Sequence, residues 1–201
     1  MLEFEKKVIL TKEEYYFLKE QQRDSAVTAV QSNHYYDTDD FELSRRGITC
    51  RIRERDGCCT ATIKEHQTKW EDCSVENSKR VKDRYDDALF RDMDVAYQGS
   101  LETVRITYMP QPGISVMLDR NSYIEIVDYE LEIEYDREHE DGATQELTRI
   151  IFDLTENGIL NDPEEFKLRI GHNKNKAARF FSRKSEIMER TGGGNDELRS
   201  E

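Results

Sequence analysis

Hydrophobic and polar residues alternate along several short segments of the chain, a period typical of β-strands with one buried face. Asp56-Gly57 favours the left-handed turn of a tight hairpin, and Pro110–Gly113 favours a second reversal. A further turn is expected at Asp119–Ser122. The predicted strands cover residues 2–10, 27–37, 48–55, 58–65, 101–109, 114–120 and, as one strand or a bent pair, 123–136.

Other segments repeat their apolar residues three and four positions apart, which indicates amphipathic helices. Leu147, Ile150, Ile151 and Leu154 follow this period and predict a helix over 143–157 that ends near Gly158. Thr11 and Glu14 form a capping-box pattern, so a helix is expected from there to about Asp24. Further helices are expected from Asp162-Pro163, over about 173–190, and in the second half of the polar stretch 67–98. The whole pattern predicts an α+β fold dominated by antiparallel sheet.

Composition narrows the class of protein. The 201 residues carry a formal net charge of −13, which disfavours general nucleic-acid binding. No apolar run is long enough to span a membrane, and the acidic N-terminus does not resemble a signal peptide. We therefore expect a cytoplasmic protein with reduced cysteines. One domain is expected over residues 1–190, followed by a disordered polar tail over 191–201.

Three predicted strands carry dense charge on one face. Side chains two residues apart on a strand point to the same side, which groups Glu3 with Glu5 and Lys7, Arg51 with Arg53, and Glu130 with Glu132 and Glu134. Taken singly, each group is most simply a face exposed to water. Taken together, the acidic and basic groups suit a closed sheet that turns its charged face inward. The apolar face would then be covered by helices.

The order of these motifs resembles the CYTH superfamily, also called triphosphate tunnel metalloenzymes. The resemblance covers most of residues 2–181, and six motifs occur in the family order. They are Glu3-Phe-Glu5-Lys6-Lys7; Tyr35-Tyr36-Asp37-Thr38 with Leu43, Gly47 and Cys50-Arg51-Ile52-Arg53; Lys64; Thr103-Val104-Arg105 with Leu118-Asp119; Asp128-Tyr129-Glu130-Leu131-Glu132-Ile133-Glu134; and Lys176 with Arg179-Phe180.

This resemblance implies an eight-stranded antiparallel closed β-barrel, or tunnel, with helices packed outside it and a triphosphate bound within. It also implies Mg²⁺ or Mn²⁺ as the cofactor. The implied metal ligands are Glu3, Glu5, Asp119, Glu130 and Glu132. The implied phosphate-binding residues are Lys7, Arg51, Arg53, Lys64, Arg105, Lys176 and Arg179, and the implied catalytic residues are Lys7 and Glu5.

The activity that follows is metal-dependent hydrolysis of a small triphosphate, with inorganic triphosphate preferred over ATP and thiamine triphosphate. A class IV-type adenylate cyclase that makes cyclic AMP from ATP is one alternative, and a thiamine triphosphatase is another. A non-catalytic domain that binds polyphosphate or nucleotide is a third. An interaction domain with water-facing charged strands is the fourth. Neither a membrane partner nor general nucleic-acid binding is expected, and a homodimer is left open.

Overall fold

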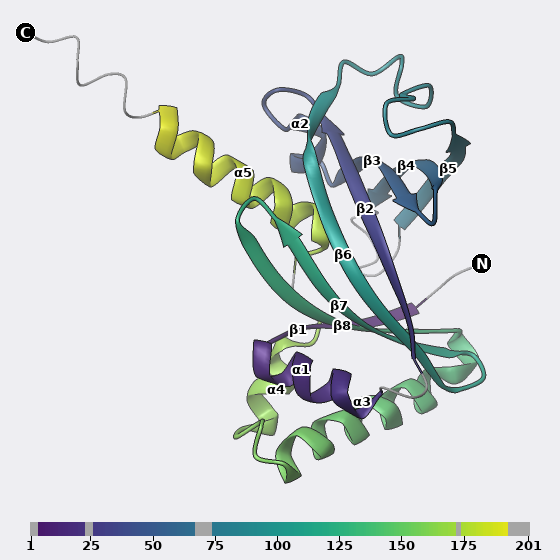
Figure 1. Ribbon diagram of the computed structural model, residues 1–201, viewed down its shortest axis with the longest axis vertical. Coiled ribbons are helices and arrows are strands. Elements are labelled where there is room, and N and C mark those ends of the chain that lie inside the picture. Colours follow the sequence, from purple (N-terminus) through teal and green to yellow (C-terminus); the bar gives the residue numbers. More distant parts are fainter. Residues whose placement is uncertain (1–3, 23–25, 67–73, 172–173, 193–201) are drawn as a thin grey trace, which may run out of the picture.

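The computed structural model describes residues 4–22, 26–66, 74–171 and 174–192. These residues form one antiparallel sheet of eight strands, together with helices (Figure 1). The strands are β1 (Phe4–Leu10), β2 (Val27–Asp37), β3 (Ile48–Arg55), β4 (Cys58–His66), β5 (Ser74–Val81), β6 (Ala96–Gln111), β7 (Ile114–Tyr123) and β8 (Ile126–Tyr135). The helices are α1 (Lys12–Gln21), α2 (Glu42–Arg45), a 3-10 turn η1 (Arg137–His139), α3 (Glu140–Glu156), α4 (Pro163–Arg169) and α5 (Lys176–Gly192).

The sheet is open, so the expected closed barrel is wrong. Its strand order is β1-β8-β7-β6-β2-β3-β4-β5. Among the described residues, β1 pairs with β8 alone and β5 pairs with β4 alone, so no hydrogen-bonded ladder joins the two ends. Closing a sheet into a barrel requires the strands to tilt and the hydrogen-bond register to stagger until the two edge strands pair. The edge strands here are short, with 7 and 8 described residues, whereas β6 has 16.

Several local predictions from the sequence are confirmed. Asp56 and Gly57 have φ values of 51° and 71°, as the predicted hairpin between β3 and β4 requires. The capping box of α1 is also confirmed, because the Glu14 amide donates to the Thr11 hydroxyl at 3.2 Å. In return, the Thr11 amide donates to the Glu14 carboxylate at 2.7 Å. The helices predicted over 143–157 and from Asp162-Pro163 correspond to α3 and α4.

Two local predictions were wrong. The second half of 67–98 is not helical: β5 ends at Val81, and turns lead from there to β6. The turn expected at Asp119–Ser122 lies inside β7, and the chain reverses instead at Ile124 and Glu125, whose φ values are 42° and 62°. Asp and Asn favour turns, but here they serve as polar side chains on a strand.

The apolar face of the sheet packs against helices. Leu118, Leu131 and Ile133 lie in one buried cluster with Ile150 of α3 and Phe166 of α4. In Figure 1, α1, α3 and α4 lie together against the end of the sheet formed by β1 and β8. A second buried cluster covers the same face of β3 and β4, around Ile52, Ala61 and Phe90 of the segment that follows β5.

Helix α5 lies on the opposite, polar face of the sheet, which corrects the expectation that all helices pack outside. Phe180 packs in a third buried cluster with Tyr35, Leu101 and Tyr123. The strand register places those three residues on the same side as Arg51 and Asp119. The predicted tail over 191–201 falls largely on residues 193–201, which lie outside the described residues. No helix among the described residues is long and apolar enough to cross a membrane.

Candidate active site

The strand register gathers the predicted site residues on one face of the sheet. Residues paired across an antiparallel ladder project to the same side. Lys7 is paired with Glu132, Glu130 with Asp119, and Asp119 with Arg105. On the other half of the sheet, Arg53 is paired with Asn33, Arg51 with Thr62, and Thr49 with Lys64. The face is continuous through β6, which pairs with both β7 and β2.

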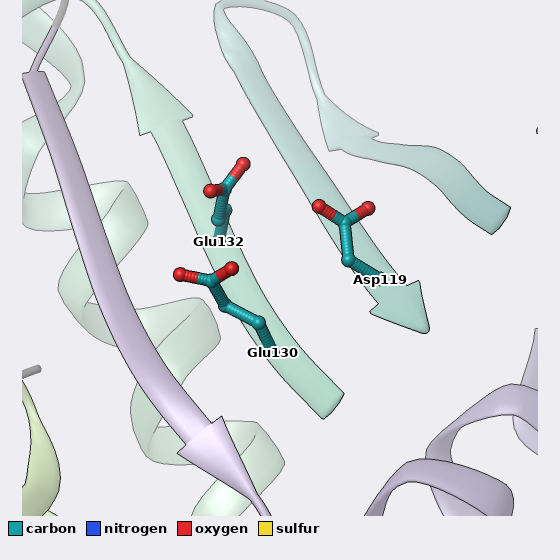
Figure 2. Close-up of side chains that lie close together, drawn as sticks. All are labelled: Asp119, Glu130 and Glu132. Atoms are coloured by element: carbon teal, nitrogen blue, oxygen red, sulfur yellow. The ribbon is translucent and has the colours of Figure 1, made fainter. Parts of the chain in front are cut away.

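The acidic half centres on three carboxylates from two neighbouring strands. Asp119, Glu130 and Glu132 each offer an oxygen that lies within 4.8 Å of the other two, and their exposed fractions are 0%, 1% and 5% (Figure 2). Leu131 and Ile133 alternate with the two glutamates and are buried under the helices. The packing of these apolar residues therefore fixes both glutamates on the polar face.

Of the other predicted metal ligands, Glu3 lies outside the described residues. Glu5 is described, but it is not among the carboxylates that lie within 4.8 Å of one another. Its carboxylate accepts from the Lys7 ammonium at 2.7 Å, and the same ammonium lies 3.6 Å from Glu132. Burial opposes the charge of Lys7, but Glu132 and Glu5 outweigh burial and raise its pKa. Lys7 is therefore a cation at neutral pH.

Cations from β6 and α5 neutralise the three carboxylates. Arg105 donates from Nε and Nη2 to both oxygens of Asp119, at 2.8 and 2.6 Å, and from Nη2 to Glu132. Lys176 contacts all three acids. Burial alone would raise the pKa of Glu132, but Lys176, Lys7 and Arg105 hold it well below its usual range. Glu132 is thus ionised, and cations within the protein compensate its charge.

Arg179 extends this network along β8. Its Nε donates to Asp128 at 2.9 Å, and its Nη2 donates to Glu130 at 3.1 Å. The sequence prediction missed Asp128, which also accepts from Asn121 at 2.9 Å and from the Tyr123 hydroxyl at 2.7 Å. Asp128 lies two residues before Glu130, so the same alternation that selected the glutamates could have identified it.

The basic half lies on β3 and β4. Within the described part of the chain, Arg51 and Arg53 form no ion pair, although Arg53 Nε donates to the amide oxygen of Asn33 at 3.0 Å. Arg51 Nε is buried without a hydrogen-bond partner. Burial, reinforced by the charges of Arg51 and Arg105, lowers the pKa of Arg53 to about 10. Two cations therefore face the polar side without an ion-paired carboxylate among the described residues. Lys64 differs, because it pairs with Glu76 at 2.9 Å.

The buried carboxylates suit a hard divalent cation. Mg²⁺ and related ions prefer carboxylate oxygens over nitrogen or sulfur. Asp119, Glu130 and Glu132 supply only such oxygens, and they come from neighbouring positions on two paired strands. These residues therefore fit the metal that the resemblance implies.

Comparisons with known proteins agree with this geometry. The model of the CYTH domain matches residues 1–162. YjbK of Bacillus subtilis, named as a candidate triphosphatase, is 28% identical over 171 residues, which cover 79% of this chain and 82% of YjbK.

Among solved structures, a candidate adenylate cyclase from Bacillus halodurans is 26% identical, with a TM-score of 0.65 and coverage of 90% of this chain and 97% of that one. HpAC1 from Hippeastrum, an adenylyl cyclase candidate described as having a dominant triphosphatase activity, has the same TM-score at 20% identity. The match covers 90% of this chain and 96% of HpAC1, and at this identity it supports the fold alone. The CYTH family model matches well over half of the residues of this chain, so this chain belongs to the CYTH domain family.

Proposed function

We propose that this protein hydrolyses a phosphoanhydride bond of a small triphosphate, with inorganic triphosphate as the preferred substrate and Mg²⁺ or Mn²⁺ as the cofactor. One observation carries the proposal. The same face of the sheet holds three clustered carboxylates on β7 and β8, and two arginines without carboxylate partners on β3, within the described residues. A phosphate chain bound together with a cation needs both kinds of group.

The arginines supply the phosphate-binding half of this site. Each guanidinium offers several N–H donors in a plane, which match the oxygens of a phosphate group. Because Arg51 and Arg53 form no ion pair with a carboxylate of the described residues, a phosphate does not have to displace one in order to bind them. Lys64 and Arg105 would contribute only by exchanging a protein carboxylate for a phosphate oxygen.

The acidic half holds the cofactor and the reacting end of the substrate. Asp119, Glu130 and Glu132 would hold the divalent ion, which when bound supplies positive charge to the phosphate oxygens. Lys7, held in its charged form beside Glu5, would bind a phosphate oxygen, and Glu5 would accept the proton of the attacking water. The new bond joins the water oxygen to the terminal phosphorus. The bond between that phosphorus and its bridging oxygen breaks, and pyrophosphate leaves.

An adenylate cyclase remains the second candidate, because a solved structure with 26% identity carries that name. In a cyclase, the ribose 3′-oxygen attacks the α-phosphorus and pyrophosphate leaves. ATP and inorganic triphosphate share the phosphate chain, so phosphate binding alone does not separate the two activities.

A product panel separates them. The purified protein is incubated with inorganic triphosphate, thiamine triphosphate, ATP or pyrophosphate, each with Mg²⁺, Mn²⁺ or EDTA. The proposal predicts phosphate release from inorganic triphosphate that exceeds release from the other substrates and stops in EDTA. Cyclic AMP formed from ATP would favour the cyclase. Binding without turnover of any substrate would favour a non-catalytic domain, and no binding at all would favour an interaction domain.

A further inference from the structure

The ammonium of Lys176 lies among the three clustered carboxylates. Its Nζ is 2.9 Å from Asp119, 2.5 Å from Glu130 and 2.7 Å from Glu132. Because the three acids are themselves mutually close, this is the position where a divalent ion would meet the same oxygens. Lys176 therefore occupies, within the protein, the place of the cation.

Electrostatics explains why a cation belongs there. Carboxylates that are removed from water need a counter-charge, and three of them within contact of one another need it more strongly. Arg105 contacts Asp119 and Glu132, and Arg179 contacts Glu130. Among the described residues, Lys176 is the cation that contacts all three at once.

The position of Lys176 on α5 allows its ammonium to leave without unfolding the helix. Lys176 is the first residue of α5, and the helix is fixed to the polar face by Phe180 and Phe181. The Asn175 side chain accepts from the Ala178 amide at 2.9 Å and so supports the first turn. A lysine ammonium sits on a flexible four-carbon stem. Rotation of that stem can therefore remove the charge while the helix stays in place.

We propose that Lys176 is a built-in counter-ion that a divalent metal displaces, and that the displaced ammonium then binds a phosphate oxygen of the substrate. The second half of this inference rests on the proposed function. Because the metal must displace Lys176, the substrate-free protein binds the metal more weakly. A triphosphate that binds the released ammonium strengthens metal binding. By linkage, the metal strengthens triphosphate binding to the same degree. Lys176 thus sets the metal affinity of the site and couples it to the substrate.

The first test measures Mn²⁺ affinity without triphosphate, by electron paramagnetic resonance of free Mn²⁺. Lys176→Met removes the competing charge and is expected to tighten Mn²⁺ binding at least tenfold. Lys184→Met is the matched control: it removes the same charge from the same helix, but Lys184 donates to Gln98 and not to the acidic cluster. Its affinity should stay within twofold of wild type. Equal or weaker Mn²⁺ binding by Lys176→Met would overturn the inference.

A second test uses the wild-type protein, so it does not depend on the folding of a variant. Lys176 is modified with an acetylating reagent, and the rate is followed by mass spectrometry with and without saturating Mg²⁺. Release from the carboxylates predicts faster acetylation with Mg²⁺, while the rate at Lys184 stays constant. An unchanged rate at Lys176 would contradict displacement.

Neither test contains triphosphate, so both remain informative if the proposed hydrolysis fails. Displacement without phosphate release in the substrate panel would overturn the proposed function and leave the counter-ion role standing. Phosphate release without displacement would overturn the counter-ion role alone.

Discussion

Asn33 lies directly opposite Arg53 across the β2–β3 ladder, and its amide oxygen accepts a 3.0 Å hydrogen bond from Arg53 Nε. A guanidinium can only donate hydrogen bonds, so the Asn33 amide must turn its oxygen toward Arg53 and its nitrogen away from it. That nitrogen is buried without a hydrogen-bond partner. The contact therefore orients an arginine that has no ion-paired carboxylate among the described residues, and the neutral amide does not balance the guanidinium charge.

Substituting both β3 arginines should abolish tight triphosphate binding. Each charge-assisted hydrogen bond contributes about 1.5–3 kcal/mol, so Arg51→Ala/Arg53→Ala is expected to weaken binding by about a hundredfold or more. Isothermal titration with inorganic triphosphate measures the change. Arg45→Ala/Arg46→Ala, which removes two exposed arginines with carboxylate partners, is the matched control. Similar affinities for the two double variants would show that the β3 pair has no special role.

Removing one clustered carboxylate should weaken metal binding. Asp119→Asn keeps the shape of the side chain but removes its charge, and we expect Mn²⁺ binding to weaken at least tenfold. Phosphate release should fall by about a hundredfold. Asp153→Asn, on the exposed side of α3, tests for a non-specific effect of the same charge change. If Asp119→Asn bound Mn²⁺ as wild type does, the metal site would have to lie elsewhere.

Much of this site could be predicted because strand alternation assigns side chains to faces. Leu131 and Ile133 identify the helix-covered face of β8, so Glu130 and Glu132 must share the other face. Alternation does not report how strands pair at long range. The closed barrel was wrong for that reason, since no periodic pattern specifies whether β1 and β5 meet.

The errors of secondary structure have a similar cause. β5 reads Ser74-Val-Glu-Asn-Ser-Lys-Arg-Val81, with few apolar residues to reveal its period. Its conformation is set by its pairing with β4, including Cys59 with Val81 and Lys64 with Glu76. On the polar face of the sheet, the polar residues of β5 pair with polar residues of β4, such as Glu76 with Lys64. A rule based on apolar periodicity therefore does not detect this strand.

The ion pair between Arg169 of α4 and Glu14 of α1 should contribute strongly to stability. The Arg169 nitrogens lie 2.6 and 3.0 Å from the Glu14 oxygens, and one also donates to the Ile9 carbonyl at 2.8 Å. Glu14 is only 2% exposed, so Arg169→Met leaves a buried carboxylate without its ion-pair partner. We expect the free energy of unfolding to fall by about 3 kcal/mol.

Urea denaturation measures this loss. Lys167→Met breaks an exposed ion pair with Glu164 on the same helix and should cost no more than about 1 kcal/mol. An equal cost for both variants would show that burial does not distinguish the two pairs.

The Lys64–Glu76 pair should make stability depend on pH in a defined window. Burial would raise the pKa of Glu76, but the hydrogen bond and charge of Lys64 outweigh burial and lower it. Because the pKa of Glu76 is lower in the folded state than in the unfolded state, the stabilisation is complete at any pH above the pKa of the unfolded state. The stabilisation is lost as the pH falls through the pKa of the folded state, which lies below the ordinary value of 4.5.

Lys64→Met removes the largest of the interactions that lower the Glu76 pKa, while the smaller contributions of Arg51 and Arg53 remain. The NMR titration of the Glu76 carboxyl carbon should therefore move to higher pH in the variant. The loss of stability between pH 6 and pH 3 should be smaller in the variant than in the wild type. An unchanged Glu76 titration would show that Lys64 is not its effective partner in solution.

The central claim is that the clustered carboxylates and the β3 arginines are two halves of one substrate site. Its most direct test is a crystal structure with Mn²⁺ and a non-hydrolysable triphosphate analogue, with the metal located by anomalous scattering. The account predicts an anomalous peak bound by Asp119, Glu130 and Glu132, with the phosphate chain reaching Arg51 and Arg53. A metal peak away from those carboxylates, or a phosphate chain that leaves both arginines uncontacted, would contradict it.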